Sequence, residues 1–140
     1  MINDIKIYAK AMKWGKWPFL ASMILAAIIV LIIGPESSSR IGTLFGYYFQ
    51  IIFAFTLLSG GIFIFYSSLV LERVASNYSD KLVPILPFFS PVHAWRFFRF
   101  AMAIGDEKLH RLAKMGIFWL YCTCSIFVTV PIGIAFLALV

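Results

Sequence analysis

The stretch Met115–Val140, MGIFWLYCTCSIFVTVPIGIAFLALV, contains no charged side chain and decides the class of fold. A helix of this length, rising about 1.5 Å per residue, can cross a hydrocarbon core roughly 30 Å thick. Two earlier runs, Phe19–Ile33 and Ile41–Leu71, also lack Asp, Glu, Lys, Arg and His. We therefore predict an all-α integral membrane protein whose 140 residues form a single membrane domain. Its three transmembrane helices are expected at residues 18–34, 41–71 and 115–140.

Composition supports a membrane protein and argues against nucleic acid as a partner. Hydrophobic residues make up 62% of the chain and charged residues 13%, whereas soluble domains usually carry about 25% charged residues. The net charge of +6 comes from basic residues that flank the apolar runs. Membrane topology explains charges in these places better than nucleic-acid binding does.

The basic residues are distributed unevenly between the two sides of the predicted bilayer. Of the 12 Lys and Arg residues, only Arg40 lies between the first two apolar runs. The others precede the first run or lie between the second and the third. Positively charged loops are retained in the cytoplasm. We therefore expect an integral protein of the bacterial inner membrane, with its amino terminus in the cytoplasm and its carboxyl terminus outside.

Residues 1–17 have the pattern of an amphipathic helix that lies on the membrane surface. One arc of such a helix carries the lysines, at Lys6, Lys10, Lys13 and Lys16. Trp14 and Trp17 fall near the headgroup level, where indole rings are favoured. Pro18 is expected to end this helix or to begin the next one. The residues predicted to contact lipid headgroups here are Lys6, Lys10, Lys13, Trp14 and Trp17.

The second apolar run carries small residues in two patches. Gly42 and Gly46 form a GxxxG pattern, and Ser59, Gly60 and Gly61 follow near the middle of the run. Small side chains let helices approach closely in a membrane, where the hydrophobic effect does not drive association. We predict that these five residues form a helix-packing interface with another membrane subunit. A kink at Gly60 and Gly61 is an alternative.

The segment 72–114 is predicted to lie in the cytoplasm and to contain a second surface helix. Ser90 offers a hydroxyl cap, and Pro91 suits the first helical position. The helix should continue through Ile104 and stop at Gly105, which makes it too short to cross the membrane. We interpret it as an interfacial helix.

The two faces of this helix are expected to differ. Trp95 and Phe98 fall on one side, and Arg96 and Arg99 fall on the other. Arginine binds phosphates and carboxylates through a planar fork. Trp95, Arg96 and Arg99 are therefore predicted to contact lipid headgroups or an acidic group on a partner.

Further predictions concern the last helix. Asp106 is a natural cap for it, and Glu107 and Arg111 are spaced for an ion pair. Pro131 should kink the third span near Phe127.

The sequence also lacks the usual signs of catalysis and of cofactor binding. No carboxylate or histidine lies within an apolar run, and His93 and His110 both lie in the segment 72–114. Intramembrane proton relays and cation sites need such groups. Cys122 and Cys124 point in nearly opposite directions on a helix and are too few for a zinc site. We predict a protein that is not an enzyme, with no catalytic residues, no metal and no haem or other cofactor.

Three functions remain for a protein of this kind. The first is a small accessory or structural subunit of a larger membrane complex, which acts through helix packing against lipids and other integral subunits. The second is a lipid- or quinone-contacting anchor subunit of a redox or transport complex, with a contact set of Tyr78, Trp95, Arg96 and Arg99. The third is a homo-oligomeric pore of the holin type. We prefer the first because the runs carry small residues and lack reactive groups.

Overall fold

The computed structural model describes residues 2–36, 38–78, 80 and 90–139. Five helices account for these residues in chain order, and no strand occurs among them. They are α1 (Ile2–Ile32), α2 (Arg40–Asn77), α3 (Pro91–Ala103), α4 (Glu107–Cys124) and α5 (Ile126–Leu139). Three segments of the described chain are long and apolar enough to cross a membrane, namely Lys6–Ile32, Arg40–Asn77 and Glu107–Leu139. The predicted all-helical class with three such helices is confirmed.

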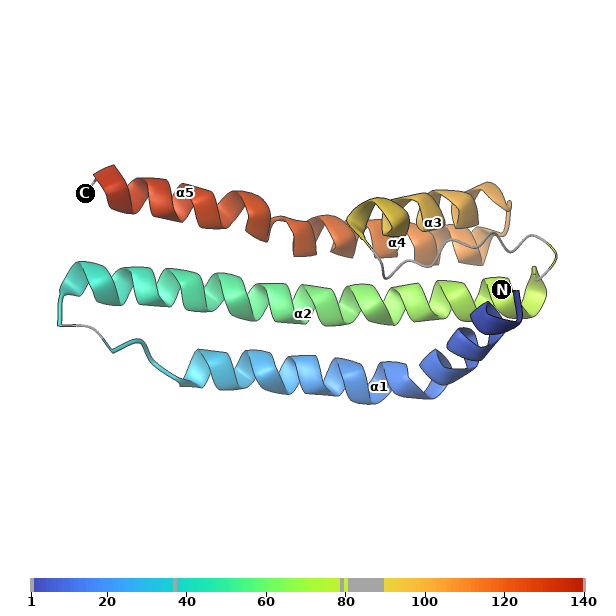
Figure 1. The fold of residues 1–140 in the computed structure, drawn as a ribbon, viewed down its shortest axis with the longest axis horizontal. Helices are drawn as coiled ribbons and strands as arrows, with labels where there is room; N and C mark the ends of the chain where they lie inside the picture. Colours follow the sequence, from blue (N-terminus) through green and yellow to red (C-terminus); the bar gives the residue numbers. More distant parts are fainter. Residues whose placement is uncertain (1, 37, 79, 81–89, 140) are drawn as a thin grey trace.

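The helices form an elongated bundle with α2 in the middle (Figure 1). Helix α1 runs antiparallel to α2 on one side, and α4 followed by α5 runs antiparallel to α2 on the other. Helix α3 folds back along α4. The amino terminus and the α3–α4 connection therefore lie at one end, and the α1–α2 loop and the carboxyl terminus lie at the other.

Two halves of this bundle differ in chemistry. We define the charged half as residues 6–18, 61–78 and 90–120, and the apolar half as residues 19–60 and 121–139. In the charged half, buried side chains of α2, α3 and α4 form one core. This core includes Val70, Leu71, Val74, Phe97, Phe98, Ala101, Leu109 and Ala113.

The centre of this core is the contact between Phe98 and Gly116. A Cβ atom at Gly116 would stand 2.5 Å from the Phe98 ring, so only glycine lets α3 approach α4 this closely. Phe98 is fully buried and also meets Phe63 edge to face, with ring centroids 6.0 Å apart. The short helix α3 is thus a packed part of the fold.

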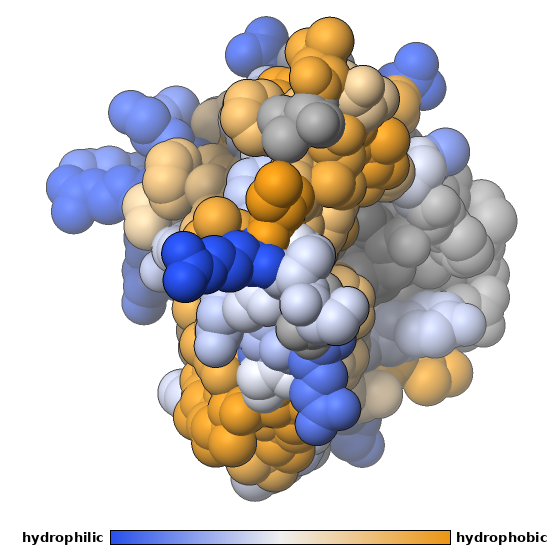
Figure 2. Space-filling view, turned by 90° about the vertical axis from the view of Figure 1, so that its left-hand side faces the viewer, coloured by the Kyte–Doolittle hydropathy of each residue, from blue (hydrophilic) through white to orange (hydrophobic). Residues whose placement is uncertain are grey.

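The apolar half has almost no core of its own. Its large side chains face outward, as with Ile32, Phe127 and Leu139, which are exposed by 75%, 74% and 86%. Figure 2 views the molecule from the end with the α1–α2 loop, where hydrophobic side chains gather above and below a paler band that contains hydrophilic ones. A surface of this kind is stable only where something apolar covers it.

The structure corrects the prediction that Pro18 bounds a helix. Helix α1 continues through Pro18, and its amino-terminal part bends towards the Asn77 end of α2 (Figure 1). A proline in a helix loses one backbone hydrogen bond and bends the axis, while its fixed φ stays compatible with the helix. Ala9, Lys16 and Ala27 are buried along α1 on both sides of this proline. Residues 2–17 therefore belong to the same helix as the segment that packs on α2.

Other helix ends agree with the sequence more closely. Helix α3 is capped by Ser90 and begins at Pro91, and Gly105 has a φ of +88° in the turn after it. The third long helix is interrupted at Ser125, two residues before the position predicted for its kink. The Ser125 hydroxyl donates to the Cys122 carbonyl at 2.6 Å.

Candidate functional site

The small residues predicted as a subunit interface pack inside this chain. A Cβ at Gly61 would stand 2.8 Å from Met23 Cβ of α1, and Gly60 faces Thr123 of α4. Ser59 is buried between these helices, and Thr123 Oγ1 donates to its hydroxyl at 3.4 Å. Glycine at these positions therefore serves the packing of α2 against α1 and α4.

The other two glycines of that set lie near the α1–α2 loop. A Cβ at Gly46 would collide with Pro35, so the loop lies directly against α2 there. The Gly42 amide donates to the Ser39 hydroxyl at 3.0 Å and belongs to the capped first turn of α2. Both positions thus have contacts within the chain, and their use as a partner interface stays a prediction.

Two polar contacts join α1 to α2 at different depths. Lys16 is only 7% exposed, and its Nζ donates to Glu72 Oε2 at 2.8 Å. The sequence placed Lys16 on the arc of surface lysines, which is wrong because this side chain turns inward to a carboxylate. Deeper in the bundle, the Gln50 amide donates to the carbonyl oxygens of Val30 and Ile33. These carbonyls at the end of α1 lack helical donors, and in lipid no water would replace them.

Asp106 is the centre of a polar cluster at the charged end. Its Oδ1 accepts from the amides of Lys108 and Leu109, which confirms the predicted cap of α4. Its Oδ2 accepts from Arg73 Nε and Nη2, both at 2.8 Å, and from the Tyr78 hydroxyl at 3.0 Å. The hydrogen bond from Arg73 is the main reason that the pKa of Asp106 falls to about 2. The same carboxylate raises the pKa of Tyr78 by accepting a hydrogen bond from its hydroxyl group.

The sequence missed the role of Arg73 in this cluster. Arg73 is the second residue after the second apolar run, so its position indicated only a membrane boundary. Asp106 lies far along the chain, and no local spacing connects the two residues. The Glu107–Arg111 ion pair, in contrast, is local to one helix turn, and its prediction is confirmed.

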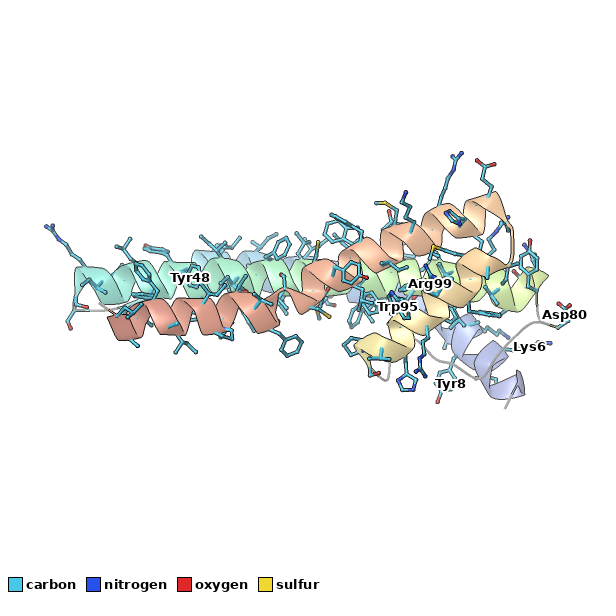
Figure 3. The ribbon with its side chains drawn as sticks, turned by 90° about the horizontal axis from the view of Figure 1, so that it is seen from above. Lys6, Tyr8, Tyr48, Asp80, Trp95 and Arg99 are labelled. Carbon is cyan, nitrogen blue, oxygen red and sulfur yellow. The ribbon has the colours of Figure 1, made fainter. Side chains whose placement is uncertain are left out.

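Helix α3 presents an aromatic and basic surface. The Arg99 guanidinium lies over the Trp95 ring, 5.5 Å from its centroid, and both residues project from α3 (Figure 3). The prediction that Trp95 shares the apolar side with Phe98 is wrong, because Trp95 is 41% exposed and Phe97 is buried instead. Arg96 is also exposed. A cleft of about 350 Å³ lies beside this surface, between Val92 and Trp95 of α3 and the Leu120–Cys124 turn of α4.

The proposed quinone-contact set is not brought together. Tyr78 donates to Asp106 near the carboxyl-terminal end of α3, whereas Trp95 lines the cleft near its amino-terminal end. No described group of three or more His, Cys, Asp or Glu residues could hold a metal ion.

Most of the surface of the residues predicted to contact headgroups at the amino terminus is exposed, although the Trp17 ring also packs edge to face against Phe65 of α2, with centroids 5.0 Å apart. Lys6, Lys10, Lys13, Trp14 and Trp17 are all exposed, and Figure 3 shows Lys6 at the charged end of the molecule. Their contact with lipid remains a prediction.

An open groove lies between α2 and α5 in the apolar half. It encloses about 420 Å³, and its lining includes Leu44 and Tyr48 of α2 and Ile132 and Phe136 of α5. Tyr48 crosses between the two helices and donates to the Thr129 carbonyl at 2.8 Å (Figure 3). Apart from this contact, α5 packs on α2 far less extensively than α1 does.

Comparison with protein-family models, with curated proteins and with solved structures found no significant match to this chain. Its function is therefore argued from the geometry above.

Proposed function

We propose that this chain is a non-catalytic accessory subunit of a larger membrane complex, inserted as three spans in a bacterial inner membrane. The amino terminus and the charged half lie in the cytoplasm, and the carboxyl terminus lies outside. The apolar half occupies the hydrocarbon. Helix α2 is about 57 Å long, well beyond the roughly 30 Å of hydrocarbon, so its charged end projects into the cytoplasm, where α3 and α4 cover it.

The observation that carries this proposal is the open groove between α2 and α5. The glycine patches are occupied within the chain, and the Gln50 amide is also bonded internally. The groove is an apolar recess of about 420 Å³ with walls on two helices. A transmembrane helix of another subunit fits such a recess, because side chains of a third helix can enter between two others.

The proposal has a direct test. The full chain is purified in mild detergent, and mass spectrometry identifies the proteins retained with it. A defined set of other integral membrane proteins is the expected result. Recovery of a homo-oligomer alone would contradict the accessory function and support the pore.

Substitutions on α5 locate the interface. Ile132→Trp fills the groove and should reduce recovery of the partner subunits at least several-fold. Phe127→Trp is the control, because Phe127 is also an exposed residue of α5 but lies outside the groove. Equal recovery with both variants would place the interface elsewhere.

The alternative of a lipid-contacting anchor rests on the α3 surface. The Trp95–Arg99 pair lies beside the Leu120–Cys124 turn, close to the level of Ser59 and Gly60 in α2. An indole with a guanidinium on its face suits the boundary between hydrocarbon and phosphates. Headgroup contact by this surface is compatible with an accessory subunit.

The orientation is tested with reporter fusions. A reporter that is active only in the periplasm should be active after Val140 and inactive after Asp80. The reverse pattern would overturn the proposed orientation.

A further inference from the structure

A second recess lies in the charged half and differs in kind from the α2–α5 groove. It encloses about 250 Å³ between α1, α2 and α4. Lys16, Arg73 and Lys108 reach it from the three helices, and Glu72 is the acidic residue in its lining. Three cationic side chains from separate helices thus converge on one cavity.

The cations of this recess keep unused donors after their internal bonds are made. Lys16 spends one N–H on Glu72, and Arg73 spends Nε and one Nη2 hydrogen on Asp106. An ammonium group carries further N–H donors, and the guanidinium keeps its Nη1 group. None of the ion pairs among the described residues involves Lys108. Even with Asp106 counted beside Glu72, the five charges leave an excess of one positive charge.

The bonds already present also fix the geometry. The carboxylates of Glu72 and Asp106 hold Lys16 and Arg73 in place, which reduces the entropy lost when a ligand binds. Asn77 adds an amide at the rim of the recess. Leu69 and Leu112 form its apolar wall. Donors that arrive from three directions suit the tetrahedral oxygens of phosphate better than a planar carboxylate.

We propose that this recess binds a phosphate group, held by Lys16, Arg73 and Lys108. The group belongs either to the headgroup of an anionic phospholipid or to soluble phosphate. Glu72 and Arg73 lie in the charged half, beyond the apolar run that ends at Leu71, so the recess opens on the cytoplasmic side in the proposed orientation. The site requires no partner subunit and goes beyond the accessory function.

The first measurement uses the purified full chain in a non-ionic detergent freed of lipid. Inorganic phosphate is titrated against chloride at matched ionic strength, and binding is followed by the thermal unfolding midpoint. The second uses nanodiscs of phosphatidylcholine with and without phosphatidylglycerol, from which retained lipid is quantified by mass spectrometry. Saturable stabilisation by phosphate identifies the soluble group. Selective retention of phosphatidylglycerol identifies the lipid headgroup.

Lys108→Gln is the decisive variant, because it removes a cation of the recess and leaves both ion pairs intact. Loss of one charge-assisted contact should weaken binding about tenfold. Lys114→Gln removes the same charge from α4 outside the recess and should leave binding unchanged. The proposal is overturned if the two variants weaken binding equally, since that result means general attraction to positive charge. It is also overturned if the unmodified chain prefers neither phosphate nor phosphatidylglycerol.

Discussion

The charged half and the apolar half share the long helix α2 but are held together by different forces. In the charged half, α2, α3 and α4 enclose a core around Phe98 and Leu109, and ion pairs join α1 and α4 to α2. In the apolar half, Tyr48 of the same helix donates to a carbonyl of α5, and Gln50 donates to a carbonyl of α1. The large side chains of this half face outward. The charged half carries its own stability, whereas the apolar half depends on its surroundings.

The largest test of this difference makes the same truncation in both halves. Phe98→Ala removes a fully buried ring and should cost about 3–5 kcal/mol of unfolding free energy. Phe136→Ala removes a ring that is 61% exposed and should cost far less. Denaturant unfolding in detergent micelles measures both. Similar losses would mean that the two halves are packed equally well.

A second test uses two neighbouring glycines at the junction of the halves. Gly61→Ala places a Cβ 2.8 Å from Met23 Cβ, which cannot move without its backbone, so a loss of about 1–3 kcal/mol is expected. Gly60→Ala meets only Thr123 Cγ2 at 3.8 Å. The second variant should gain about 0.5–1 kcal/mol from the greater helix propensity of alanine. Changes of the same sign in these neighbours would refute the close approach of α1.

A third test uses pH to isolate the Asp106 cluster. The pKa of Asp106 lies near 2 in the folded chain and near its ordinary value of 3.8 when unfolded. Its stabilising effect is therefore complete above about pH 4 and is lost as the pH falls through about 2. Asp106→Asn keeps a capping side chain but removes the charge, so unfolding of this variant should depend less on pH in that window.

Glu107→Gln provides the control for that experiment. The Glu107–Arg111 pair is exposed on both sides, and such pairs contribute only about 0.3–0.5 kcal/mol. If the dependence of unfolding on acid pH disappears with Glu107→Gln and persists with Asp106→Asn, its source is Glu107, and the prediction for Asp106 is wrong.

The smallest expected effect concerns Arg96 and Arg99. Replacing both with Lys keeps the charge, so attraction to anionic lipid should survive, while a specific forked contact should weaken. The stacked pair of Arg99 with Trp95 contributes about 0.5–1 kcal/mol at an exposed site. Normal assembly of the Lys variant, combined with failed assembly of the Ala variant, would limit these arginines to anchoring the membrane surface.

The sequence predicted those features that depend on neighbours along the chain. Ser90, Pro91, Gly105 and Asp106 lie at helix ends as expected, because capping is decided within a few residues. The apolar runs predicted the three long helices for the same reason. The prediction for Trp95 was wrong. Helical spacing put it beside Phe98 on the apolar side, whereas Trp95 is exposed and Phe97 is buried in the structure.

The features that escaped prediction depend on distant pairs. Lys16 with Glu72 and Arg73 with Asp106 require knowledge of which helices lie side by side. The glycines of α2 were recognised as sites of close approach, but the pattern cannot tell a neighbour in the same chain from one in another. The structure supplies these partners as Met23 and Thr123.

The two partly buried ion pairs also concern the order of events during synthesis. Arg73 emerges from the ribosome 33 residues before Asp106, and Lys16 emerges 56 residues before Glu72. In the orientation proposed above, each cation is therefore unneutralised while its own helix is being oriented by the insertion machinery, which responds to positive charge. The carboxylate arrives afterwards and converts the orienting charge into a tertiary contact. The same side chains can thus direct insertion first and stabilise the completed bundle later.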